Sequence, residues 1–329
     1  MQIFKTPNID FLRWRWHAIL LSWLVIAAGL VTIWQKGLPL GVEFSGGTIV
    51  IVQFDQQPPD SSTIRAALER DLPGEGQNAV IQRYGLEAQH QIMISVPSVG
   101  AESGAGLSQT ADRAVNALKK AGLNPKVNGT EIVGPAVGAD LKRKGILATV
   151  LSLVGILAYI AFRFKFSFAV GTVVATIHDL FVTLAFLAFF RYDLSLNVIA
   201  AILTVTGYST NDTIVIFDRV RENMRGMRRD SMYDIVNRSV NQTMSRTVIT
   251  AGTALLSALA LFFFGGEVLH GFAFTMIVGI VTGTYSSVFI ASAIAIIWQS
   301  RVRGARAVSK SAPDTAPDKA RKPTRRRAS

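Results

Sequence analysis

The chain has 329 residues, of which 50% are hydrophobic and only 17% are charged, and its mean hydropathy is +0.34. A soluble globular chain rarely has such an apolar composition, so the sequence predicts a membrane protein. The formal net charge is +12, and residues 299–329 alone hold ten Lys and Arg against two Asp. Because the rest of the chain is nearly balanced, this charge does not indicate a nucleic-acid-binding protein.

The residue types on which many enzymes and metal sites depend are scarce. The chain has no cysteine, which excludes disulfides, thiol nucleophiles and Cys-ligated metals. Its four histidines are far apart in sequence and none belongs to an HExxH motif, so we predict no metal or other cofactor. The sequence also lacks a G-x-x-x-x-G-K-[ST] motif, which excludes an intrinsic P-loop ATPase. We therefore expect no enzyme, but a protein driven by a partner or by an ion gradient.

The first apolar run, at 18–34, follows Lys5, Arg13 and Arg15. A cleaved signal peptide has a similar pattern, but no small-residue cleavage site follows here, which favours an uncleaved span. Five further runs are near or above the roughly 18–20 residues that cross the hydrocarbon core. The sequence thus predicts six transmembrane helices, the later ones at 146–162, 167–190, 195–217, 244–264 and 271–298.

Residues 36–144 are polar, mixed in charge and too long for a simple loop. Two stretches in this region have apolar residues at helical spacing, one after Asp60 and one from Leu107 to Leu118. Four short runs have the composition of strands. Their order along the chain is βαββαβ, which predicts a ferredoxin-like α+β domain with strands at 48–54, 79–84, 91–96 and 126–133.

The basic residues predict the orientation in the membrane. They precede the first span, lie between spans two and three and between four and five, and fill the tail, whereas the opposite loops hold only Arg191. The positive-inside rule then places both termini in the cytoplasm and 36–144 outside. The basic run 142–144 disagrees, but long translocated domains follow the rule weakly. The predicted organisation has an N-terminal span, an outer domain, five further spans and a basic tail, at 1–35, 36–144, 145–298 and 299–329.

The tail at 299–329 is rich in Ala, Pro, Ser and basic residues, a composition typical of disorder. Its charge suits either a solvated cytoplasmic stretch or contact with anionic lipid. The sequence favours the solvated stretch.

Ionisable residues inside predicted spans are costly, at least about 2.5–3.5 kcal/mol each on insertion scales, and so mark candidate functional sites. His178 and Asp179 lie near the middle of the third span. Adjacent helix positions are about 100° apart, so the two side chains should not share a face, and we expect at least one to point into the bundle. A structural hydrogen-bonded pair and part of a proton or ion path are equally compatible with this dipeptide.

Asp212 lies in the fourth span, within the polar run Gly207–Thr213. Tyr208 and Ser209, at positions i−4 and i−3, lie on its side of the helix, and Asn211 and Thr213 flank it. Burial raises the pKa of a carboxyl, whereas a nearby cation lowers it. A carboxyl between these two effects can load and release a proton near neutral pH. We favour this proton relay over a permanently paired structural carboxylate.

Arg246 begins the fifth span, at about the same depth as Asp212. The two side chains could form an ion pair that opens on protonation, or Arg246 could extend to the membrane surface as a snorkelling residue. The sequence does not distinguish these. The sixth span carries a row of small residues that favours close helix packing, at Thr275, Gly279, Gly283, Ser287, Ala291 and Ala295.

Six motifs lie along the chain: GVEFSGG at 41–47, VGPAVG at 133–138, HD at 178–179, GYSTNDTIVIFDRVREN at 207–223, SRT at 245–247 and GTYSS at 283–287. Taken together, these motifs are similar to those of the SecF members of the SecD/SecF family, within the resistance-nodulation-division superfamily. The resemblance covers nearly everything from the first to the last span. Glu43 stands where the family usually has Asp, which keeps the charge.

The resemblance implies a subunit of the bacterial inner membrane that forms an obligate complex with a SecD-like protein. It further implies association with the SecYEG channel and, in many bacteria, with YajC and YidC. Such a pair draws out preproteins that SecA has pushed in with ATP, and it uses the proton-motive force. On this resemblance Asp212 and Arg246 belong to the proton path.

Two alternatives remain. One is half of a proton-driven exporter of small molecules or lipids from the same superfamily, although such exporters usually hold two six-span halves with larger outer domains. The other is a passive scaffold whose polar residues only fix packing.

Overall fold

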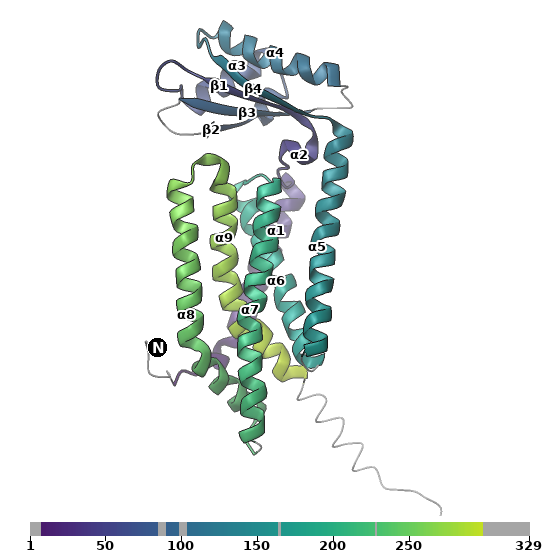
Figure 1. Cartoon of the computed structure of the whole chain (residues 1–329), viewed down its shortest axis with the longest axis vertical. Helices are drawn as coiled ribbons and strands as arrows, with labels where there is room; N and C mark the ends of the chain where they lie inside the picture. Colours follow the sequence, from purple (N-terminus) through teal and green to yellow (C-terminus); the bar gives the residue numbers. More distant parts are fainter. Residues whose placement is uncertain (1–7, 85–89, 99–103, 164–165, 228, 299–329) are drawn as a thin grey trace, which may run out of the picture.

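The computed structural model describes residues 8–84, 90–98, 104–163, 166–227 and 229–298. Above a bundle of long helices lies a small sheet with two helices on its far side (Figure 1). The predicted disorder and lipid contact of the tail concern 299–329, which lies outside the described residues.

Among the described residues, the bundle consists of six long helices that lie at the predicted spans, although the helices at 135–163 and 232–264 begin before their spans and the helix at 196–226 ends after its span. A short 3-10 turn, η1 (Phe11–Trp14), precedes the first of them. The last continues into a π-helical turn, η4 (Ser287–Ala291). The six are α1 (Arg15–Lys36), α5 (Pro135–Arg163), α6 (Phe166–Phe190), α7 (Leu196–Gly226), α8 (Met232–Phe264) and α9 (Glu267–Ser286).

Five helical segments in the described part of the chain are long and apolar enough to cross a membrane, and α7 is not among them. The polar run 207–213 interrupts its apolar sequence and lowers its hydropathy. The protein is therefore a multi-pass membrane protein with five candidate spans, and the crossing by α7 stays a prediction.

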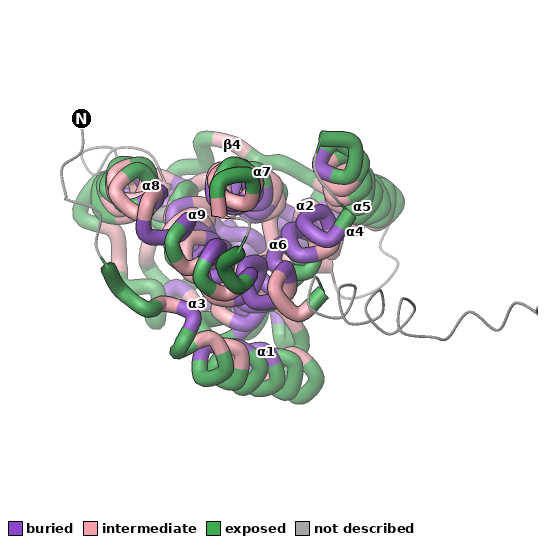
Figure 2. Tube along the Cα trace, turned by 90° about the horizontal axis from the view of Figure 1, so that it is seen from below, coloured by how far each residue is buried: buried purple, intermediate pink, exposed green. Residues whose placement is uncertain are grey.

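Burial separates the central helices from the peripheral ones. In the most apolar stretch of α5 and of α8 only 6% and 11% of the residues are buried, against 50% in α6 and 61% in the segment that contains α9 and η4. Figure 2 shows the buried residues gathered between the helices and the exposed ones along the outside of α1 and α5. The exposed apolar side chains of α1, α5 and α8 suit contact with lipid, whereas α6, α7 and α9 form the centre.

The four predicted strands are present and form one antiparallel sheet in the order β2-β3-β1-β4. They are β1 (Gly47–Gln53), β2 (Val80–Tyr84), β3 (Gln91–Pro97) and β4 (Lys126–Val133). The helices α3 (Ser61–Asp71) and α4 (Gly104–Lys120) cover one face, and a short turn, η2 (Gly76–Asn78), precedes β2. Alternation along β1 sends Val50 and Val52 into the core beneath these helices. The opposite face looks toward the bundle (Figure 1).

A short helix, α2 (Val42–Ser45), joins α1 to the sheet and ends at two glycines. Gly46 and Gly47 have φ values of 75° and 149°, which L side chains rarely adopt. A Cβ at Gly47 would also overlap the carbonyl of Val96. The two glycines therefore permit the sharp entry into β1 that the chain needs here.

The segment before α2 is tied to the connection between α6 and α7. Gly41 N–H donates to the carbonyl of Leu194 at 2.9 Å, and Leu194 N–H donates to the carbonyl of Pro39 at 2.8 Å. The two strands of chain form an isolated parallel bridge between Leu40 and Leu194. This link fixes the sheet domain to the outer end of the bundle.

Candidate functional site

Asp179 of α6 accepts hydrogen bonds from three helices at the centre of the bundle. Its Oδ1 lies 3.0 Å from Nδ1 of His178. Its Oδ2 accepts from the hydroxyls of Ser209 in α7, at 2.5 Å, and Ser286 in α9, at 2.8 Å. Only 3% of Asp179 is exposed. Both carboxylate oxygens are therefore occupied, as a buried charge requires.

His178 is buried as well, so both members of the dipeptide point into the bundle. We expected at least one to do so, and adjacent helix positions would normally separate them. Helices α1, α7 and α9 pack around α6, so a wide arc of its surface is interior. Nε2 of His178 has no hydrogen-bond partner among the described residues. Which atom donates between Nδ1 of His178 and Oδ1 of Asp179 depends on the tautomer of the imidazole ring.

Asp212 of α7 is buried but only half satisfied. The hydroxyl of Thr247 in α8 donates to its Oδ1 at 2.7 Å. Its Oδ2 is buried and has no partner among the described residues. A buried carboxylate with an unpaired oxygen is costly unless a donor or a proton satisfies that oxygen. The geometry therefore leaves a place for one proton at Asp212.

Arg246 does not meet Asp212 in this structure. Among the described residues the two form no ion pair, and Arg246 lies on the exposed side of α8. The next residue, Thr247, faces α7 instead, because one helix position turns the side chain by about 100°. The sequence left open whether Arg246 pairs with Asp212 or extends to the membrane surface, and in this structure Arg246 is exposed and forms no ion pair with Asp212.

The polar side chains in the run 207–213 of α7 point to different sides of the helix. Ser209 was expected beside Asp212 but bonds Asp179 instead. Thr213 faces α9 and shares a hydrogen bond of 2.7 Å with Ser287. Asn211 is exposed and Tyr208 is half-buried, so neither is enclosed with Asp212. Among the described residues, the run thus supplies a hydrogen bond to Asp179 through Ser209, whereas Asp212 receives its hydrogen bond from Thr247 of α8.

The small residues of α9 let it approach α7 closely. A Cβ at Gly279 would overlap the side chain of Val205, and a Cβ at Gly283 would lie 2.7 Å from Cβ of Ser209. Ser287 follows on the same row and is fully buried. This close approach brings Ser286 within reach of Asp179, and the π-helical turn η4 begins directly after it.

Two residues of the site carried no predicted role. Thr247 and Ser286 occur within the motifs SRT and GTYSS, yet each motif offers other polar residues. Only the rotation of α8 and α9 in the packed bundle selects these two hydroxyls. Within the described residues, no group of His, Asp and Glu side chains forms a metal site.

Comparison with known proteins assigns the chain to a family. Residues 113–301 match the model "Protein export membrane protein SecD/SecF, C-terminal", and residues 31–58 match "SecD/SecF GG Motif". Among curated proteins, the "Protein translocase subunit SecF" of Desulfurispirillum indicum is 40% identical over 296 residues, which covers 89% of this chain and 92% of that protein. The protein of that name from Vibrio alginolyticus is 41% identical over 297 residues, with coverages of 90% and 91%.

Comparison with solved structures leads to the same family. A crystal structure of SecDF from Thermus thermophilus, described as translocon-associated, superposes with a TM-score of 0.76 at 34% identity and covers 91% of this chain. A SecDF structure in a super-membrane-facing form gives a TM-score of 0.69 at 35% identity and covers 94% of this chain. The present chain spans only 40% and 41% of those two longer chains. From its motifs, its fold and these matches, the chain belongs to the SecD/SecF family of protein-export membrane proteins.

Proposed function

We propose that this chain is a SecF-type subunit of the Sec translocase. With a SecD-like subunit in the bacterial inner membrane, it uses the proton-motive force to complete preprotein translocation after the ATP-driven phase of SecA. The observation that carries the proposal is Asp212, a carboxyl buried within the bundle with one oxygen open to a proton. The names of the relatives support the translocase role over that of a small-molecule or lipid exporter.

The energy of a proton gradient suffices for such work. Moving one charge across 100 mV yields about 2.3 kcal/mol. Reversing a two-state equilibrium from 1:99 to 99:1 takes about 5.5 kcal/mol. Three protons per cycle, about 7 kcal/mol at 100 mV, can therefore drive a change in conformation of the outer domain.

We assign the site residues two roles. Asp212 takes up and releases the proton, and Thr247 holds its other oxygen in place. Asp179 and His178 form a second protonatable pair one helix away, which Ser209, Ser286 and the Thr213–Ser287 contact orient. Arg246, on the exposed side of α8, supplies a cation for ionised Asp212 or for the carboxylates of the partner subunit.

The topology follows from the same proposal. We infer that α7 also crosses the membrane, which brings the number of transmembrane helices to six, because it packs among the five candidate spans and its buried polar residues face inward. Both termini then lie in the cytoplasm. The sheet and its helices form a ferredoxin-like periplasmic domain at 36–144, an assignment that the strand order supports. Spans fill 1–35 and 145–298, and the cytoplasmic tail at 299–329 contacts water or anionic lipid. The SecYEG channel, YajC and YidC are the further partners proposed from the family.

The test is transport in vesicles that contain this chain, its SecD-like partner and the Sec channel. A preprotein is stalled late in transit, ATP is removed and a proton gradient is applied. We expect the wild type to complete transport and Asp212→Asn to stall. Asp218→Asn is the matched control, because Asp218 is an exposed carboxylate one and a half turns further along α7. If Asp212→Asn completes transport as well as the control does, Asp212 has only a structural role.

A further inference from the structure

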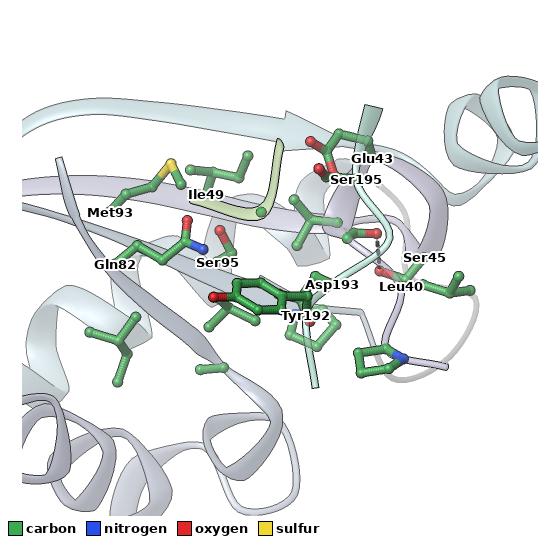
Figure 3. Close-up of a pocket in the computed structure, with 18 of the residues that line it drawn as sticks. Leu40, Glu43, Ser45, Ile49, Gln82, Met93, Ser95, Tyr192, Asp193 and Ser195 are labelled. Atoms are coloured by element: carbon green, nitrogen blue, oxygen red, sulfur yellow. Dashed lines mark hydrogen bonds between the residues drawn. The ribbon is translucent and has the colours of Figure 1, made fainter. Parts of the chain in front are cut away.

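A cleft lies between the open face of the sheet and the outer end of the bundle. Its volume is about 1150 Å³. Strands β1, β2 and β3 form one wall, and the connection between α6 and α7 with the start of α9 forms another. Figure 3 shows side chains from both walls around this space. The cleft is larger than the roughly 300–1,000 Å³ of a typical small-molecule pocket.

The sheet wall offers alternating apolar and polar surface. Ile49 and Ile51 of β1 and Met93 of β3 are only half-buried, because α3 and α4 cover the other face. Gln82 of β2 pairs with Met93, and Ser95 of β3 pairs with Ile49, and these two add an amide and a largely buried hydroxyl to the lining (Figure 3). An extended polypeptide has this same character, with apolar side chains on alternate positions and backbone polar groups at every residue.

The basic side chains that line the cleft have interaction partners, whereas its carboxylates form no ion pair among the described residues. Its arginines bind backbone carbonyls: Arg191 donates to those of Lys36 and Gly37, at 3.3 and 3.1 Å, and Arg65 to those of Gln77 and Ala79, at 2.8 and 2.9 Å. The third basic residue, His270, stacks on Tyr192 and meets Phe262 at a tilt of 57°. The three carboxylates of the lining make no ion pair among the described residues, namely Glu43, Glu131 and Asp193.

The charge of Glu43 acts on Asp193. Burial first, and then the charge of Glu43, raise the pKa of Asp193, which is about 6 although the charge of Arg191 lowers it. A cation in the cleft would offset both the cost of burying the charge of Asp193 and its repulsion by Glu43. The unpaired carboxylates therefore favour a basic occupant over a neutral or acidic one.

We propose that this cleft binds an extended segment of unfolded polypeptide that carries Lys or Arg. Its apolar side chains pack on Ile49, Ile51 and Met93, its backbone meets Gln82 and Ser95, and its cation lies between Glu43 and Asp193. The proposal rests on the proposed function and adds to it the surface at which the transported chain is held.

The first experiment locates the segment. A photoreactive benzoylphenylalanine is placed at Gln82 or Met93 of the full chain, in the vesicle system with a stalled preprotein. The matched control places it at Asn116, an exposed position of α4 on the other side of the sheet. We expect adducts with the preprotein from positions 82 and 93 but not from 116. Equal adducts from 82 and 116, or adducts only with lipid or with another translocase subunit, would overturn the proposal.

The second experiment tests the charge preference. The purified complex is titrated with a fluorescent unstructured peptide of alternating Leu and Lys, and with its Leu and Glu counterpart. We expect the Lys peptide to bind about tenfold more tightly, and the double variant Glu43→Gln, Asp193→Asn to lose this difference. Equal binding of the two peptides to the wild type would contradict the proposal. Both experiments are independent of the gradient, so they can fail while gradient-driven transport succeeds, and the reverse.

Discussion

Thr247 donates a 2.7 Å hydrogen bond to one oxygen of Asp212, while the other oxygen remains unpaired. This contact joins α8 to α7 at the only carboxyl that α7 buries among the described residues. It holds the carboxyl in one rotamer and directs the open oxygen to a fixed position. If Asp212 carries a proton as proposed, this contact keeps the geometry of the carboxyl constant as the proton binds and leaves.

Replacing Thr247 with Val should release Asp212 while preserving the packing volume. The remaining buried acceptor loses its only donor, so we expect a loss of stability of about 1–3 kcal/mol. Thr247→Ser keeps the hydroxyl and should recover most of this. Thermal unfolding of the detergent-solubilised protein measures the loss, and the vesicle assay measures transport. A Val variant as stable and active as the Ser variant would show that the contact has no role.

The contribution of the hydrogen-bond donors of Asp179 to stability should depend on the charge of this carboxylate. Ser286→Ala removes one of three hydrogen bonds from a buried carboxylate, and we expect a cost of about 1–3 kcal/mol. In a chain that already carries Asp179→Asn, the same substitution should cost less, because a neutral amide needs its partners less. A double-mutant cycle on thermal stability measures the difference as a coupling energy. Purely additive effects would mean that the serine acts through packing alone.

Close packing of α9 against α7 should be sensitive to a single methyl group. Gly283→Ala places a Cβ 2.7 Å from Cβ of Ser209, so a helix must shift. We expect a loss of about 1–3 kcal/mol, as for other overpacked positions. Gly252→Ala in α8 is the matched control, since no atom lies within 4 Å of the added Cβ. The control should be neutral or up to about 1 kcal/mol more stable. Thermal unfolding of the single chain in detergent compares the two.

Asp193 should make the stability depend on pH in mildly acidic solution. Its pKa is raised from 3.8 to about 6 in the folded protein, by burial and by Glu43. Between these two values the folded state binds more protons than the unfolded state, so stability rises as the pH falls from about 6 toward 4. Asp193→Asn should be more stable than the wild type at pH 7.5, and should lose this part of the pH dependence. Melting curves at several pH values would contradict the prediction if the two proteins respond alike.

Much of the fold could be predicted because long apolar runs and alternating strands leave a clear periodic signal. The strand runs at 48–54 and 91–96 and the helices at 146–162 and 167–190 are examples. The helix at 195–217 was predicted too, although its polar run weakens the apolar signal by which a span is recognised.

The site was harder to predict than the fold. The sequence left open whether Arg246 pairs with Asp212, and the rotation of α8 about its axis brings Thr247 to the carboxyl. The same limit explains why Ser209 bonds Asp179 and not Asp212. Helix rotation follows from packing among many side chains, and no local pattern encodes it. The cleft could not be predicted either, because its walls come from two separate parts of the chain, at 39–131 and 190–271.

The parallel bridge between Leu40 and Leu194 acts as a mechanical linkage. Leu194 lies just before α7, the helix of Asp212, and Leu40 lies just before the double glycine that leads into β1. Any sliding or tilting of the outer end of α7 must therefore be followed by the root of the sheet, or must break two backbone hydrogen bonds. A displacement that starts in the membrane has a short route to the outer domain, through a few residues of backbone and without the help of the peripheral helices.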